Sequence, residues 1–559
     1  MMKPILTTVV ALIPAISLAA VLTAFSAVCP VSFPATVSAQ SSAECAPTIE
    51  VDKFRFLRQV TLDMLGRIPT YEEYDALRNA EDPAAFIDGR IDAMFSDEEY
   101  FREIRSYHQG LLWGSLDQVN SLQAGGQRLS FNRAAGDMWF VGNNRRRYRG
   151  LTTVTCLDQP QNNYDAAGRP VPIATFSDPA CSNVGAGPGT CVQEGYELVR
   201  PYWNPTIEIK VCAFDAMDVQ TGINGSPCDS YNPDRGCGCG PNLQHCMRNN
   251  ESGPLRAALE EEPVRIFEHV VRTDADYLEA FTTRTSFVSG PSAHYYNYQS
   301  GARTETLGGA VAYTTQMGAI PDLPYTDAET WRPVIRGPQH AGFTTTFGYL
   351  MRFASDRARA NRFYTTFYCD PFVPKADGLP AEEENPNPNL RERSGCADCH
   401  QELEVAASHW GRWRTNSTYG YFGDFMSFGE PRADCLCGPG TGRANCSAYC
   451  NTYHVTAANS HPSTYESYGG LPLSRIYLSE LEAAAIDSGP TALVDEPHEQ
   501  ELVASCTVRT LAEHLLNRPL MPNEFQWLED QTAIFVADGR RFSNLYRTLL
   551  QDPKYRQIR

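Results

Sequence analysis

Apolar residues recur at helical spacing through residues 50–115. The pattern breaks at Gly66 and Pro69, and Thr70 followed by Glu73 has the form of a capping box that starts a new helix. The apolar positions on either side of the break are Phe56, Val60 and Leu65, then Ile87, Ile91, Met94 and Phe95. Because each set falls on one helical face, we expect these side chains to lie in a core.

Helical periodicity returns in residues 254–376 and again in 471–559. The clearest stripe consists of Ile266, Phe267, Val270 and Val271. A proline inside a helix removes a backbone donor, so we expect a break in this region near Pro263. The region around Phe347 to Phe353 has the same character and predicts another helix.

Residues 116–253 have a different texture, rich in Gly, Pro, Asn and Cys and without apolar periodicity. Residues 377–470 begin with a Pro- and acid-rich linker and carry a second group of cysteines. We therefore predict a mainly α fold, in which multi-helical modules are interrupted by disulfide-rich irregular insertions.

The N-terminus joins one lysine to a long apolar run and ends in a small-x-small pattern near Ala39. This arrangement predicts a signal peptide, with an uncleaved membrane anchor as the alternative. No later segment is apolar enough to span a bilayer. We expect an exported protein, in the periplasm or on the outer surface of a Gram-negative bacterium. Its net charge of −19 argues against nucleic acid as a partner.

The 18 cysteines fit an oxidising compartment. Most fall in two clusters with even counts, which predicts local disulfide frameworks: Cys156, Cys181, Cys191, Cys212, Cys228, Cys237, Cys239 and Cys246, then Cys435, Cys437, Cys446 and Cys450. Cys29 lies in the predicted signal peptide, and Cys45, Cys369 and Cys506 lie outside both clusters and the C-x-x-C-H motif. Because these three are an odd number, at least one thiol is expected to be free or paired outside the chain.

The motif that carries chemistry is C-x-x-C-H, formed by Cys396, Cys399 and His400. Two thiols at this spacing meet the two vinyl groups of a haem, and the adjacent imidazole binds iron. The alternatives are a disulfide or redox dithiol, a zinc site completed by Cys435–Cys437 and Cys446–Cys450, and a chance match. We favour one covalent haem c. The motif occurs once, which excludes multihaem electron wires.

The motif does not identify the residue that would be the sixth iron ligand. Met426 lies in a loop-like stretch downstream, where small cytochromes place their distal methionine, and it is our first candidate. Met351, Met317 and His340 are further candidates. His409 is too close in sequence to His400 to span the iron, although it could contact a propionate. Trp410 and Trp413 are expected to be ordinary core residues, with packing against the macrocycle as the alternative.

Several segments together resemble exported planctomycete-type cytochrome c proteins, which place serial domains of unknown function around one C-x-x-C-H motif. The segments are FLRQVTLDMLGRIPTYEEY, DADYLEAFTTRTSFV, HAGFTTTFGYLMRFASDRARANRF, CADCH followed by GRWR, and FVADGRRFSNLYRTLLQDPKYR. Their order matches that group, whereas the acidic D-P element expected after the motif is replaced by QELEVAASHW. The resemblance implies a helical fold and electron transfer, and it names no substrate.

These observations divide the chain into 1–39, a signal peptide; 50–115, an N-terminal helical module; 116–253, a Cys- and Gly-rich irregular insertion; 254–376, a second helical module; 377–470, a haem-binding segment with the second cysteine cluster; and 471–559, a C-terminal helical module.

The leading hypothesis is an exported monohaem c-type cytochrome that exchanges electrons with a partner protein or a small-molecule donor or acceptor. A haem-coupled periplasmic oxidoreductase with an unknown substrate is the second hypothesis. The third is a disulfide-rich extracellular binding or scaffold protein without haem. No G-x-S-x-G, H-E-x-x-H, P-loop or EF-hand pattern assigns an enzyme class, so whether the chain is an enzyme stays open.

Overall fold

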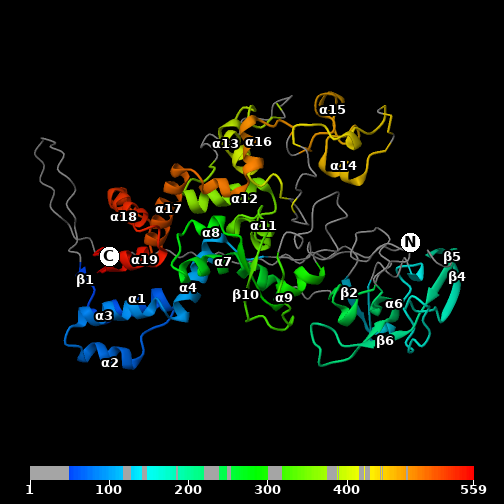
Figure 1. Cartoon of the computed structure of the whole chain (residues 1–559), viewed down its shortest axis with the longest axis horizontal. Helices are drawn as coiled ribbons and strands as arrows, with labels where there is room; N and C mark the ends of the chain where they lie inside the picture. The colour runs from blue at the N-terminus through cyan, green and yellow to red at the C-terminus, as the bar shows by residue number, and fades with distance from the viewer. Residues whose placement is uncertain are drawn as a thin grey trace, which may run out of the picture. The chain divides into compact units, whose positions relative to one another are not determined.

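The apolar faces predicted near the N-terminus become four helices (Figure 1), whose bounds are α1 (Lys53–Leu65), α2 (Tyr71–Asn79), α3 (Pro83–Met94) and α4 (Glu98–Leu112). Each begins at a polar N-cap. The predicted capping box at Thr70 and Glu73 is confirmed, with both of its hydrogen bonds present. Asp52, Asp82 and Asp97 cap the other three helices through their carboxylates.

The structure, a computed structural model, describes residues 49–116, 128–141, 148–183, 187–219, 238–248, 253–299, 318–373, 387, 389–413, 421, 428–440, 442–443, 445–473 and 476–558. The predicted signal peptide and Met426 lie outside these ranges. Among the described residues, no helix has the length and apolar character needed to cross a membrane.

The remaining helices follow in chain order: α6 (Ala213–Ala216), α7 (Gly253–Arg272), α8 (Glu279–Thr282), α9 (Gly290–His294), α11 (Phe347–Arg352), α12 (Asp356–Phe363), α13 (Ala397–Ser408), α14 (Ala448–Tyr453), α15 (Pro462–Tyr468), α16 (Glu480–Ser488), α17 (Pro497–Leu516), α18 (Phe525–Ala537) and α19 (Phe542–Gln551). One hydrophobic core runs from Phe56 on α1 to Tyr555 near the C-terminus. It draws on α4, α7, α11, α12 and α17, so modules far apart in sequence share a single interior.

The prediction of a mainly α fold was wrong. Of the described residues, 50% are helical and 13% lie in strands, and they include a five-stranded mixed sheet in the order β6-β7-β3-β2-β8. These strands are β2 (Arg128–Asn132), β3 (Met138–Val141), β6 (Tyr196–Val199), β7 (Ile209–Cys212) and β8 (Met247–Arg248). They are two to five residues long, too short for the alternation of apolar and polar residues to be visible in the sequence.

The described part of residues 116–253, which was expected to be irregular, therefore forms a small β structure. In the sheet, β2 pairs antiparallel with β3, and β3 pairs in parallel with β7, about seventy residues away in sequence. A separate hairpin joins β4 (Ala174–Asn183) to β5 (Gly187–Gln193). Two further two-stranded sheets pair β9 (Thr285–Val288) with β10 (Arg332–Ile335), and β1 (Ile49–Glu50) with β11 (Gln557–Ile558).

Six disulfides are present within the described residues, and they confirm the prediction of local frameworks. Three lie in the first cluster, Cys156–Cys212, Cys181–Cys191 and Cys239–Cys246, and two in the second, Cys435–Cys450 and Cys437–Cys446. The sixth, Cys369–Cys506, bridges 137 positions and ties the end of the Tyr364–Tyr368 turn to α17. Cys45, Cys228 and Cys237 lie outside the described residues.

The prediction of a helix break near Pro263 was wrong, because α7 runs without interruption through this proline. A proline leaves the carbonyl of residue i−4, here Leu259, without its helical N–H donor. Gly348 on α11 lies against that carbonyl so closely that an added Cβ would be 1.9 Å from the Leu259 oxygen. The missing side chain lets α11 pack directly on the proline-containing turn of α7.

Gly348→Ala is expected to lower the free energy of unfolding by roughly 3 kcal/mol, because the methyl group would force two packed helices apart. Gly89→Ala on α3 is the matched control, since an added Cβ there meets nothing within 4 Å. The control should be neutral or stabilising by up to about 1 kcal/mol. Denaturant unfolding measures both variants, and equal stabilities would contradict the packing argument.

His108 lies wholly buried in the core on α4. Its Nδ1–H donates to the Ile104 carbonyl at 2.7 Å, and its Nε2 accepts from the Tyr277 hydroxyl at 3.0 Å. The ring stacks on Phe267 with 4.2 Å between centroids. Burial lowers the pKa of His108 from 6.5 to about 3, because the imidazolium cannot be solvated there.

The stability of the protein should therefore fall as the pH drops below 6.5. Between pH 6.5 and 3 the unfolded chain binds a proton at His108 that the folded chain does not, which costs about 1.4 kcal/mol per pH unit. His108→Leu should remove one proton from the pH dependence of the unfolding midpoint. His498→Gln, at an exposed position, should leave the wild-type slope. A His108→Leu slope identical to wild type would contradict this account.

Candidate functional site

The C-x-x-C-H motif opens α13. Cys396 is the N-cap residue of the helix, and the His400 N–H donates to the Cys396 carbonyl at 3.0 Å. Residues three and four apart face the same side of a helix, so Cys396, Cys399 and His400 lie on one face of the first turn. The described residues directly before the motif, 389–395, form turns and no strand. This differs from the strand–CxxC–helix arrangement of thioredoxin-like oxidoreductases.

The far end of α13 is held by the core. Trp410 is fully buried, and its indole N–H donates to the Thr344 carbonyl at 3.1 Å. Trp413, exposed by 2%, lies with its ring 4.9 Å from that of His340. Both tryptophans belong to the main hydrophobic core, as expected. The helix therefore has one rigid end in the interior and presents its first turn toward the surface.

Beside the motif, a carboxylate fixes the orientation of the His400 ring. Its Nδ1 lies 2.6 Å from Oε1 of Glu404, one helical turn further along α13. The same oxygen accepts from Nε of Arg357 on α12 at 2.7 Å, so Glu404 is ion-paired in a largely buried position. Because an ionised carboxylate only accepts, His400 carries its proton on Nδ1, and the Nε2 lone pair is left for a metal.

Both thiols of the motif are free. Among the described cysteines, Cys396 and Cys399 are the two outside disulfides, and each is partly buried. The Cys399 Sγ lies 3.7 Å from the Val373 carbonyl, and the Val373 side chain is 66% exposed. A C-x-x-C pair that forms no disulfide and lies beside an exposed valine is suited to two thioether bonds and to a flat apolar group covering it.

The donor set thus fits a covalent haem. It offers two free thiols, one imidazole with a fixed tautomer and an available Nε2, and a partly exposed setting on the first turn of a helix. A bound haem would be held by Cys396 and Cys399 through thioethers and by His400 at the iron.

The structure places none of the other candidate side chains as a ligand of the iron. Met426 and Met317 lie outside the described residues. Met351 and His340 are buried in the helical interior, at 7% and 1% exposure. The Nδ1 of His409 lies 2.9 Å from the Gly489 carbonyl, and burial lowers the pKa of this imidazole. The structure therefore assigns no sixth ligand.

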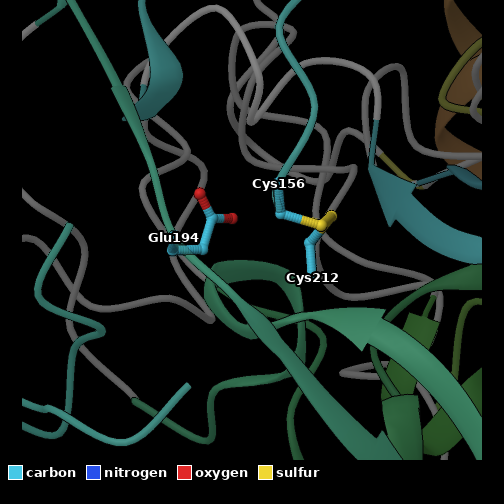
Figure 2. Close-up of side chains that lie close together, drawn as sticks. All are labelled: Cys156, Glu194 and Cys212. Carbon is cyan, nitrogen blue, oxygen red and sulfur yellow. A yellow bond between two sulfur atoms is a disulfide. The ribbon is translucent and has the colours of Figure 1, made fainter. Parts of the chain in front are cut away.

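The alternative of a zinc site is not supported, because its four additional cysteine ligands are disulfide-bonded. Cys435 pairs with Cys450, and Cys437 pairs with Cys446, so none of the four is a free thiolate. The Cys156–Glu194–Cys212 cluster has metal-like proximity, but Figure 2 shows its two sulfurs joined in a disulfide. The Asp434–Cys435–Cys450 cluster is likewise closed by its disulfide.

Glu194 instead belongs to a buried charge cluster in the sheet module. The fully buried Arg149 pairs with both Glu194 and Asp215, with Nη2 at 3.1 Å from Asp215 Oδ2. Asp215 also accepts from the Val141 N–H at 3.0 Å, which links α6 to β3. Burial raises the pKa of Glu194, although Arg149 opposes that effect. This cluster organises the β module and offers no free donor set.

Comparison with family models, with curated proteins and with solved structures finds no match for this chain. The assignment of the site therefore rests on its residues. The sequence interpretation missed Glu404 and Arg357. Glu404 stands four residues after His400, a spacing that would have indicated the contact once a helix was assumed, whereas Arg357 is supplied by another helix.

Proposed function

We propose that this chain is an exported monohaem c-type protein that transfers electrons. The observation that carries the proposal is that Cys396 and Cys399, beside His400, form no disulfide, in a chain whose other described cysteines are all disulfide-bonded. A haem bound there would supply one-electron oxidation and reduction at its iron. The order of segments that resembles planctomycete-type cytochrome c proteins points the same way.

Each residue of the site has a separate task. The Cys396 and Cys399 thiols would each add across a vinyl group, with sulfur bonding one carbon and the thiol hydrogen passing to its neighbour, so no oxidant is needed. His400 would offer Nε2 to the iron. Glu404 holds the His400 ring in one tautomer and increases its electron donation, and Arg357 forms an ion pair with Glu404.

The surroundings fit an extracytoplasmic electron carrier. Six disulfides among the described residues suit an oxidising compartment, where covalent haem attachment also takes place. A net charge of −19 favours a basic or neutral electron-exchange partner, and a basic one would be steered toward the acidic surface.

Covalent haem can be tested directly on protein exported together with a c-type maturation system. The intact mass should exceed that of the apoprotein by one haem, and the pyridine haemochrome spectrum should show a c-type α-band. Cys399→Ser should lose the stable double attachment and greatly reduce haem content, because one of the two thioether sites is removed.

The matched control is the double variant Cys437→Ser, Cys446→Ser, which removes two sulfurs from a disulfide outside the motif. It should retain the haem. A wild-type protein with apoprotein mass, and with Cys396 and Cys399 oxidised to each other, would contradict the proposal and favour a disulfide-rich protein without haem.

The contact between Glu404 and His400 predicts a lowered midpoint potential, since a carboxylate at Nδ1 makes the imidazole a stronger donor and stabilises ferric iron. Glu404→Gln should raise the potential by roughly 60 mV, equivalent to about a tenfold change in the one-electron equilibrium. Spectroelectrochemical titration measures the shift.

Glu402→Gln, on an exposed turn of the same helix, removes the same charge without contacting His400 and should change the potential far less. Equal shifts in the two variants would show that net charge, rather than the hydrogen bond to His400, sets the potential.

A further inference from the structure

A second site is indicated by one buried arginine that differs from the others. Arg149, Arg336, Arg359 and Arg362 are the arginines buried in the described structure. Arg149 pairs with two carboxylates, and Arg336 and Arg359 donate to backbone carbonyls at 2.7–3.3 Å. Arg362, on α12 and 7% exposed, makes no hydrogen bond or ion pair with any described residue. A buried guanidinium normally has its donors satisfied, so Arg362 needs another partner.

One face of the Arg362 guanidinium is covered by an aromatic ring. Its Cζ lies 4.0 Å from the ring centroid of Trp113, the residue that ends α4. The Nε of Arg362 is buried without a hydrogen-bond partner, whereas its two Nη atoms are not fully enclosed. The cation–π contact offsets part of the charge and leaves the N–H donors unused. The Nη groups are therefore donors that a molecule from solvent can reach.

A second arginine adds positive charge at the same place. Arg352, the last residue of α11, donates from Nε to the Trp113 carbonyl at 2.7 Å and has no ion pair in the described structure. The carboxylate of Glu260, on the helix α7 that packs against α4, lies 3.9 Å from Arg256 instead. Burial lowers the pKa of Arg362 to about 10, and the charge of Arg352 acts in the same direction, so Arg362 stays charged at pH 7.

The end of α4 accounts for only one of these two arginines. The last carbonyls of a helix favour a nearby cation, and the hydrogen bond from Arg352 to the Trp113 carbonyl meets that need. Arg362 donates to none of the described carbonyls, so helix capping does not explain its position. A buried charge that lacks a protein partner lowers stability, which is typical of a site kept for a ligand.

The chemistry of these groups selects the ligand. Guanidinium groups present paired N–H donors that match the oxygens of phosphates and carboxylates, and they repel cations. Two positive charges are matched better by a phosphate monoester, with a charge of about −1.5 to −2 at pH 7, than by a carboxylate. The Trp113 side chain is 61% exposed, so an apolar group attached to the phosphate can pack against its ring.

We propose that Arg352 and Arg362 bind the phosphate group of a small phosphate ester, with the organic part of the ester against the exposed ring of Trp113. The Nη groups of both arginines would donate to the phosphate oxygens. The assignment is independent of the haem, because none of the three residues belongs to the C-x-x-C-H motif or to the Glu404–Arg357 pair.

Isothermal titration of the full-length exported protein with phenyl phosphate, at low ionic strength, tests the assignment. Saturable binding at one site is expected. Arg362→Met should weaken it at least tenfold, because a charge-assisted contact to the phosphate is lost. The same variant should unfold at no lower denaturant concentration than the wild type, since an unpaired buried charge is removed. Arg352→Gln, at a less buried position, should weaken binding by a smaller factor and tests the second arginine separately.

Arg102→Gln is the matched control, since it removes one exposed positive charge three turns before Trp113 on α4. It should bind phenyl phosphate as the wild type does. Benzoate, a monoanion with the same ring, should bind at least tenfold more weakly. Absence of saturable binding, equal weakening by Arg102→Gln and Arg362→Met, or equal affinity for benzoate and phenyl phosphate would overturn the assignment.

Discussion

The buried guanidinium of Arg359 is the constraint on which the position of the haem-type motif depends. This side chain has no solvent exposure, yet it donates to the carbonyls of Phe353, Leu350 and Trp413 at 2.9–3.4 Å and pairs with Asp356 at 3.0 Å. An arginine taken out of water must have its donors satisfied, so these carbonyls can occupy only a narrow range of positions. The end of α11 and the segment that follows α13 are thereby held at fixed places on α12.

Buried charged side chains also fix neighbouring backbone segments in two other parts of the chain. Glu262, buried on α7, accepts from Ser286 Oγ and from the Tyr296 hydroxyl at 2.8 Å each, and so ties β9 and the turn after α9 to the central helix. In the β module, Arg149 joins Glu194 and Asp215. Burying such charged groups costs desolvation free energy, and once they are paired they restrict the packing to few alternatives. The chain combines one large apolar core with a few polar centres that set its geometry.

Local features of this protein could be read from its sequence. Helical periodicity, the Thr70–Glu73 capping box and the C-x-x-C-H spacing are each encoded within a few neighbouring residues, so they predict helices, a helix start and a donor set without knowledge of the fold. Even cysteine counts predicted disulfides within each cluster without giving the pairing. Only the tertiary structure decided the pairing of β3 with β7, the disulfide from Cys369 to Cys506, the unbroken helix through Pro263 and the approach of Arg357 to Glu404. Each of these joins residues distant in sequence or depends on a neighbour such as Gly348. Their energy comes from packing and charge pairing, which short-range patterns do not record.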